Sequence, residues 1–210
     1  MSFGISSLAS SSSGNCYVVR SDNTVILLDV GISLRKIKEY LKFKDLELSQ
    51  IDAVLVTHEH SDHVSALTMW SRYYNTPVYL PRAISHEVIN KTYSTNVVEL
   101  DGSSFAIGNA TVDVYTCSHD AKCCYGYRFG DGHTFVARVT DTGTVEPNLV
   151  TFLSPCTTIQ LESNHDVTML KNGPYPFPLK QRILSPLGHQ SNHTCAQLLA
   201  DNFHPGLRNI

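Results

Sequence analysis

Residues 57–63 concentrate side chains that bind metal ions. The segment reads T-H-E-H-S-D-H and contains His58, His60, Asp62 and His63. Neutral imidazole nitrogen and carboxylate oxygen are ligands that zinc, manganese and iron share. In a nearly extended segment, side chains alternate, so His58 and His60 point to the same side and can bind one metal. A turn then directs Asp62 and His63 toward a second metal, and the segment therefore predicts a metal site.

Apolar runs along the chain predict the elements that position this segment. The run IDAVLV directly before the histidines is typical of a buried central strand. A histidine cluster on the surface is the alternative, but such a cluster seldom follows an apolar strand. Further strand patterns precede and follow this run, and helical stripes begin at Leu34, Val64 and Cys195. This order favours a layered α/β protein and excludes an all-β barrel or a helical bundle.

Composition narrows the class of protein. With 210 residues, 42% hydrophobic and 17% charged, the chain is expected to form one globular domain over residues 1–210. A formal charge of −3 gives no overall attraction to nucleic acid or membrane. No signal peptide or membrane-spanning run is recognisable. The six cysteines lack CxxC spacing, so free thiols and a cytoplasmic location are expected, although Cys117, close to His119, remains an alternative zinc ligand.

Motifs in a fixed order then relate the chain to a known family. The pattern His58-x-His60-x-Asp62-His63 resembles the HxHxDH signature of the metallo-β-lactamase superfamily. The segments SSLASSSSGNCYVV, ILLDVGIS, TCSHD, GYRFG, VTDTG, LESNHD and GHQSN follow the order of its YycJ/WalJ-like branch. The resemblance implies an αββα sandwich, in which two mixed β-sheets are flanked by helices. It also implies activity on the phosphodiesterase and nuclease side of the superfamily.

The same resemblance assigns ligands for two divalent ions, zinc or manganese. It gives the first ion His58, His60 and His119, gives the second Asp62 and His63, and makes Asp141 the bridge. His119 and Asp141 each end an apolar, strand-like run, which independently supports a common edge. Without the resemblance, the first could be a histidine that binds no metal and the second an ordinary turn aspartate. Asp29 matches an aspartate that supports the ligands in the family, but by chemistry alone it could cap a turn, and we treat it as structural.

Two late segments carry further histidines, His165 in LESNHD and His189 in GHQSN. The resemblance places His189 beside the scissile phosphate as a general acid, so Asp62 and His189 are the expected catalytic residues. Glu162 could orient His189 through the other ring nitrogen. A capping or packing role for both histidines is the alternative.

One element of the family pattern is expected to be absent. Family members continue with a strand that carries a last histidine ligand, whereas this sequence ends at HPGLRNI. The chain could be shortened, could be a catalytically degenerate relative, or could use His189 or His204 as the replacement ligand.

The leading hypothesis is therefore a dinuclear metal-dependent hydrolase, a phosphodiesterase or exonuclease acting on DNA. It needs no small organic cofactor and no membrane, and its oligomeric state is not predicted. Tyr175 and Phe177, among Lys171, Lys180 and Arg182, could contact nucleic acid or form a solvated loop with packed aromatics. The alternatives are a hydrolase of small esters, thioesters or lactams, and a degenerate metal-binding regulator.

Overall fold

The computed structural model describes residues 3–90 and 96–210. Contacts divide the chain into two compact units. Unit 1 comprises Met1–Val112 and Ala121–Cys123, and unit 2 comprises Asp113–Asp120 and Cys124–Ile210. Each unit contains one of the two clusters of candidate ligands.

Unit 1 is built on a six-stranded mixed sheet with strand order β1-β2-β3-β4-β5-β6. Its strands are β1 (Gly4–Ala9), β2 (Cys16–Arg20), β3 (Val25–Val30), β4 (Ala53–Leu55), β5 (Val78–Pro81) and β6 (Val97–Leu100). The first three strands pair antiparallel, and β3 to β6 pair parallel. The parallel strands β3 and β4 are almost wholly buried, as expected for strands covered on both faces.

Four helices and a 3₁₀ turn complete unit 1. They are α1 (Leu34–Lys42), the turn Leu48–Gln50, α2 (Ser61–Val64), α3 (Leu67–Tyr73) and α4 (Arg82–Ile89). Leu41 of α1, Trp70 of α3 and Ile84 of α4 are completely buried and share a core with Leu27 and Val54 of the sheet. This apolar contact fixes the ends of β3 and β4, where the candidate ligands begin.

The second sheet is five-stranded, with the order β11-β10-β9-β8-β7. Its strands are β7 (Phe105–Ile107), β8 (Ala110–Thr116), β9 (Tyr125–Gly130), β10 (Phe135–Val139) and β11 (Thr158–Leu161). β9 and β10 pair antiparallel, whereas β10 and β11 pair parallel across a helical connection. Both sheets are therefore mixed, as the family resemblance implied.

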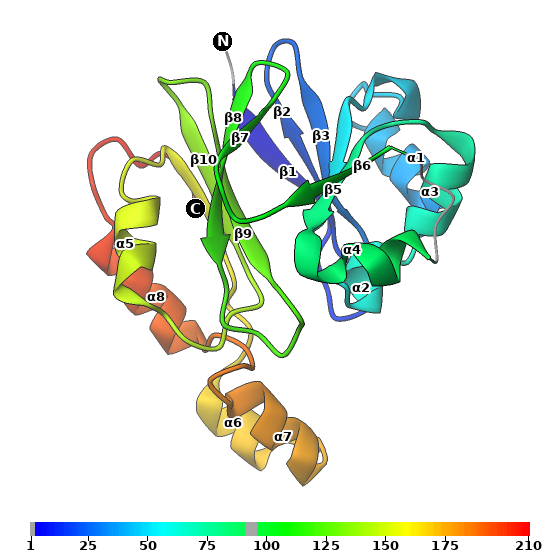
Figure 1. Ribbon diagram of the computed structural model, residues 1–210. Helices are drawn as coiled ribbons and strands as arrows, with labels where there is room; N and C mark the ends of the chain where they lie inside the picture. The colour runs from blue at the N-terminus through cyan, green and yellow to red at the C-terminus, as the bar shows by residue number, and fades with distance from the viewer. Residues whose placement is uncertain (1–2, 91–95) are drawn as a thin grey trace. The chain divides into compact units, whose positions relative to one another are not determined.

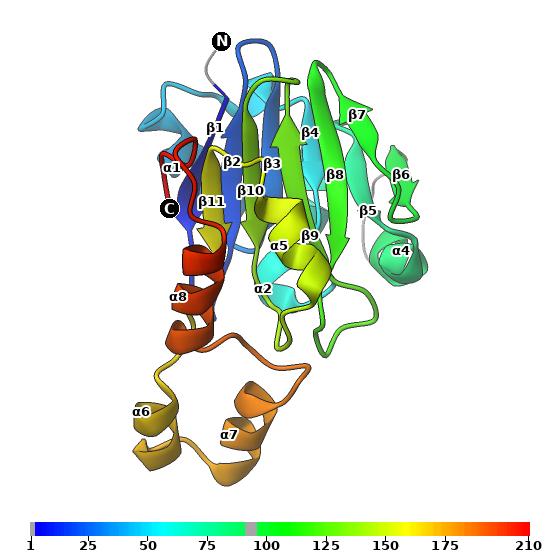
Figure 2. The ribbon, with the colours of Figure 1, turned by 90° about the vertical axis from the view of Figure 1, so that its left-hand side faces the viewer.

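The helices of unit 2 fall into two groups. They are α5 (Pro147–Leu153), α6 (Val167–Asn172), α7 (Phe177–Leu184) and α8 (Asn192–Asp201). α5 and α8 cover one face of the strands β9 to β11, whereas α6 and α7 lie beyond one end of these strands (Figures 1 and 2). Asp166 caps α6 and Ser191 caps α8, each by accepting a main-chain hydrogen bond.

The α/β class with helices flanking two mixed sheets is confirmed, and one detail differs. The helical stripe after the histidines is not one helix, because α2 ends before α3 begins. The single domain over residues 1–210 stays a prediction. Among the described helices, none has the length and apolar character needed to cross a membrane.

Near residue 210, Asn209 forms a parallel bridge with Thr158 of β11. The main-chain N–H of Arg208 donates to the carbonyl of Thr157. The last residues thus lie along the edge of the second sheet.

Candidate functional site

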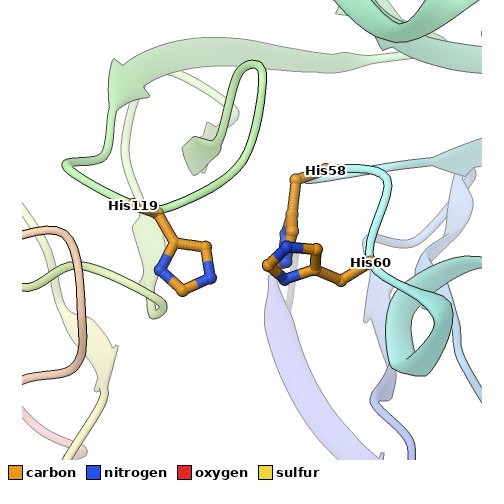
Figure 3. Close-up of side chains that lie close together, drawn as sticks. All are labelled: His58, His60 and His119. Atoms are coloured by element: carbon orange, nitrogen blue, oxygen red, sulfur yellow. The ribbon is translucent and has the colours of Figure 1, made fainter. Parts of the chain in front are cut away.

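The first cluster lies on the loop and short helix after β4, in unit 1. We call His58, His60, Asp62 and His63 the His58 cluster; Figure 3 shows the first two on this loop. The His58 ring centroid lies 4.6 Å from that of His60 and 4.1 Å from that of His63. Nε2 of His63 lies 3.3 Å from Oδ2 of Asp62, so these two neighbouring side chains also lie close together. The structure thus brings the four residues of the HxHxDH segment together.

Asp29 fixes the orientation of His63. Its carboxylate is completely buried, and Oδ2 lies 2.8 Å from Nδ1 of His63. It also accepts hydrogen bonds from the main-chain N–H and the hydroxyl of Thr57. A carboxylate that accepts the Nδ1 proton leaves the lone pair of Nε2 for a metal, as in many metal sites. Asp29 therefore orients His63 and does more than cap a turn.

Thr57 links the same carboxylate to His58. Because its hydroxyl donates to Asp29, it can accept from Nδ1 of His58, which lies 2.9 Å away. His58 and His63 are thus both held through Nδ1 and both present Nε2. Sequence reasoning gave no role to Thr57, which directly precedes the motif.

The sequence analysis also missed Asn15 and Gly31. The Asn15 side chain donates to Oδ2 of Asp62 at 3.1 Å, and its main-chain N–H donates to the Asp62 carbonyl at 2.8 Å. A Cβ on Gly31 would lie 1.6 Å from the same carbonyl oxygen, so only glycine fits there. Both residues stand in segments quoted for the resemblance, SSSSGN and LLDVG, and that was their only signal.

The second cluster lies in unit 2 and consists of His119, Asp141 and His189, called the His189 cluster below. His119 follows β8 (Figure 3), Asp141 follows β10, and His189 precedes α8. One potential ligand atom from each lies within 4.8 Å of the other two. Nδ1 of His119 lies 3.3 Å from the carbonyl oxygen of Gly188, and Nε2 lies 3.4 Å from Oδ1 of Asp120.

Glu162 holds His189, as the sequence suggested. Its Oε1 lies 2.6 Å from Nδ1 of His189, and Oδ1 of Asp141 lies 3.7 Å from the same nitrogen. Burial lowers the pKa of His189, but the hydrogen bond and charge of Glu162, helped by Asp141, outweigh it and raise the pKa above its usual value. This environment therefore favours the protonated form of His189 more than water does.

Among the described residues, His165, His204 and Cys117 belong to neither of these two clusters of possible metal ligands. His165 forms a main-chain bridge with Ser191 and a side-chain contact with Asn164. Both ring nitrogens of His204 lie 3.1 Å from main-chain atoms, the carbonyl oxygen of Cys156 and the nitrogen of Gly206. Within residues 3–90 and 96–210, Cys117 joins no group of possible metal ligands.

The donor set suits a divalent metal. Each cluster combines imidazoles held through Nδ1 with at least one carboxylate, the ligand chemistry that divalent transition metals accept. Metal binding requires imidazoles in the neutral form and carboxylates in the ionised form.

Comparisons with known proteins agree with this chemistry. Residues 11–151 match the family model of the metallo-beta-lactamase superfamily. The chain is 35% identical over 205 residues to exodeoxyribonuclease YycJ of Bacillus anthracis, covering 96% of this chain and 78% of that protein. It is 34% identical over 205 residues to exodeoxyribonuclease WalJ of Streptococcus pneumoniae, covering 94% and 76%.

A solved structure agrees on the fold. The metallo-beta-lactamase fold protein YhfI of Bacillus subtilis superposes with a TM-score of 0.70 at 18% identity, covering 92% of this chain and 76% of that one. The chain therefore belongs to the metallo-β-lactamase superfamily, within its YycJ/WalJ-like branch.

Proposed function

We propose that this chain is a metal-dependent exonuclease that hydrolyses phosphodiester bonds of DNA. The observation that carries the proposal is its 34–35% identity, over 94–96% of its length, with relatives named exodeoxyribonucleases. The two clusters support it, because they supply the ligand types of a hydrolytic metal centre.

The proposed ligands follow the family pattern. His58, His60 and His119 would hold one divalent ion, Asp62 and His63 would hold a second, and Asp141 would offer its carboxylate to both. Zinc and manganese both suit these donors. When bound, two such ions activate water and stabilise the negative charge that develops on a phosphodiester.

The chain's own residues have separate roles in the proposed reaction. Asp29 and Thr57 hold the two buried imidazoles of the His58 cluster, so that Nε2 of each faces the ligand position. Asp62 acts as a catalytic residue as well as a ligand. His189 is the proton donor to the leaving oxygen, with Glu162 at Nδ1 holding the ring and favouring its protonated form.

The metal content of the purified chain and nucleotide release test this proposal together. Elemental analysis should find two divalent ions per chain, and manganese should support release of mononucleotides from end-labelled DNA. His58→Ala should remove at least one ion and abolish release. His86→Ala is the matched control, because His86 is an exposed histidine of α4, and it should leave both quantities unchanged.

His189→Ala separates proton donation from ligation. It should slow release while sparing the metal content, and loss of an ion instead would make His189 a ligand. A metal-loaded wild-type chain that cleaves small esters or thioesters but neither single-stranded nor duplex DNA would contradict the proposed substrate. The rate of nucleotide release at low DNA concentration should also fall as the salt concentration rises, because phosphate contacts displace counterions.

A further inference from the structure

The helices α6 and α7 form a hairpin with an unusually exposed apolar surface. Tyr175, in the turn between them, is 54% exposed, and Phe177, which begins α7, is 70% exposed. Met169 of α6 is 74% exposed, and α7 has no buried residue. The hairpin lies beyond one end of the sheet of unit 2 (Figure 2). Exposed aromatic side chains gathered on one small element are typical of a binding surface.

The charge of this region favours an anionic partner. Residues 167–200 contain no aspartate or glutamate, although the whole chain has a formal charge of −3. The same stretch contains Lys171, Lys180 and Arg182. Lys171 is exposed. Nζ of Lys180 donates to the main-chain carbonyl oxygen of Lys171 at 2.8 Å, so both positive charges lie where α6 meets α7. A phosphate backbone is attracted to such a surface.

Arg182, which is half exposed, pairs with a carboxylate beside the His189 cluster. Its Nε lies 2.5 Å and its Nη2 3.1 Å from the two carboxylate oxygens of Asp120, the residue after His119. The main-chain N–H of His189 donates to the carbonyl of Ile183 at 3.0 Å, next to Arg182. The end of α7 is thus attached to the segments of both histidines. A ligand bound on the hairpin would therefore lie beside the chain segments that carry His119 and His189.

We propose that the α6–α7 hairpin is a docking platform for single-stranded DNA. Tyr175 and Phe177 stack on bases, Lys171 and Lys180 attract the backbone, and Arg182 holds the platform beside the His189 cluster. Stacking on aromatic side chains beside positive charge is how proteins bind single strands without sequence preference. The inference rests on the proposed exonuclease function and adds how that enzyme holds its substrate.

Fluorescence anisotropy tests this platform directly. The probe is a labelled oligothymidylate with phosphorothioate linkages, which resist hydrolysis, titrated with the metal-loaded full chain. Tyr175→Ala and Phe177→Ala should each weaken binding about fivefold or more. Lys171→Ala should lower the slope of log affinity against log salt by about 0.7. Phe203→Ala is the matched control, because Phe203 is 76% exposed in the same unit but outside the hairpin, and it should bind as the wild type does.

Two further variants of Phe177 separate stacking from apolar association. Phe177→Trp should keep the affinity, whereas Phe177→Leu, which preserves apolar surface, should lose it. Hydrolysis of bis(p-nitrophenyl) phosphate, too small to reach the hairpin, should proceed at the wild-type rate in all these variants. That rate also shows that each variant is folded.

Unchanged affinity in both alanine variants would overturn the inference. So would a wild-type dimer, detected by sedimentation equilibrium, that dissociates in these variants without a change in DNA affinity, because the hairpin would then bind a second copy. If the wild type binds DNA through the hairpin but releases no nucleotides, the proposed function fails while the platform stands.

Discussion

Replacing Asp29 by asparagine should weaken metal binding without unfolding the chain. Asp29 has a φ of +59°, which asparagine tolerates better than other non-glycine residues, so the backbone strain should not increase. In the wild type, Oδ1 of Asp29 accepts the main-chain N–H of Thr57 at 2.9 Å, and the amide oxygen of asparagine can still do so. The amide nitrogen, however, replaces Oδ2, which lies 2.8 Å from Nδ1 of His63.

An amide nitrogen donates and cannot accept, so the substitution changes the tautomer of His63. The ring must move its proton from Nδ1 to Nε2 to accept the new N–H, and Nε2 then loses the lone pair that faces Asp62. Loss of such a supporting contact typically costs 10- to 100-fold in metal affinity, roughly 1.4–2.7 kcal/mol. In the metal-free chain, a neutral hydrogen bond replaces one to a charged group, a difference of about 1 kcal/mol, which lowers the Tm by roughly 2–4 °C.

Competition with a chromophoric chelator measures the metal Kd, and thermal unfolding in chelator measures the Tm. Asp45→Asn is a matched control, because Asp45 has a φ of +55° but is exposed after α1. It should change neither quantity. A metal Kd for Asp29→Asn within twofold of the wild type would refute the assigned role of Asp29.

Three more outcomes follow from the contacts of unit 2 and from the thiols. Glu162→Gln should lower kcat about tenfold or more, with the metal content measured by elemental analysis unchanged, because its Oε1 holds His189. His204→Ala should also leave the metal content unchanged, because both ring nitrogens contact main-chain atoms; loss of an ion would show that His204 is a ligand. In reaction with a disulfide reagent at pH 8, one thiol should react first, and Cys123→Ser should remove that phase. Cys123 is the one partly exposed thiol among the six cysteines, whereas burial raises the pKa of Cys156 to about 12.

The sequence predicted the sheet class and the His58 cluster because both depend on local patterns. An apolar run followed at once by ligands places the ligands at the end of a buried strand, whatever the remaining chain does. The contacts that orient the ligands depend instead on residues far apart in the chain. Asn15 and Asp62 are separated by 47 positions, and no periodicity relates them.

The division of the helix after the histidines has the same origin. In a continuous helix the N–H of Ala66 would donate to the carbonyl of Asp62. That carbonyl accepts from Asn15 instead, and the N–H of Ala66 donates to Val30 at the end of β3. A tertiary contact has thus replaced a helical hydrogen bond, which the apolar stripe could not indicate.

The exposed hairpin illustrates a different limit. The sequence left open whether Tyr175 and Phe177 contact nucleic acid or pack within a solvated loop, and in the structure both are mostly exposed. Whether an aromatic side chain is buried depends on what the rest of the fold brings against it, and here the elements around it are two short helices.

The segments LLDVG, in unit 1, and VTDTG, in unit 2, share one local arrangement of an aspartate and a glycine. Asp29 and Asp141 have φ values of +59° and +58°, a strained conformation for residues other than glycine. Each aspartate contacts a histidine, since Asp29 lies 2.8 Å from Nδ1 of His63 and Asp141 lies 3.7 Å from Nδ1 of His189.

The glycine two residues after each aspartate allows another segment of main chain to approach closely. A Cβ on Gly31 would lie 1.6 Å from the carbonyl oxygen of Asp62, next to His63 in the chain. A Cβ on Gly143 would lie 2.6 Å from the main-chain nitrogen of Gly188, next to His189. In both segments, therefore, the aspartate contacts the histidine while the glycine admits the main chain that carries it. The D-x-G spacing places the aspartate and the glycine where these two contacts require them. The strained backbone thus lies at the aspartate whose side chain contacts an imidazole.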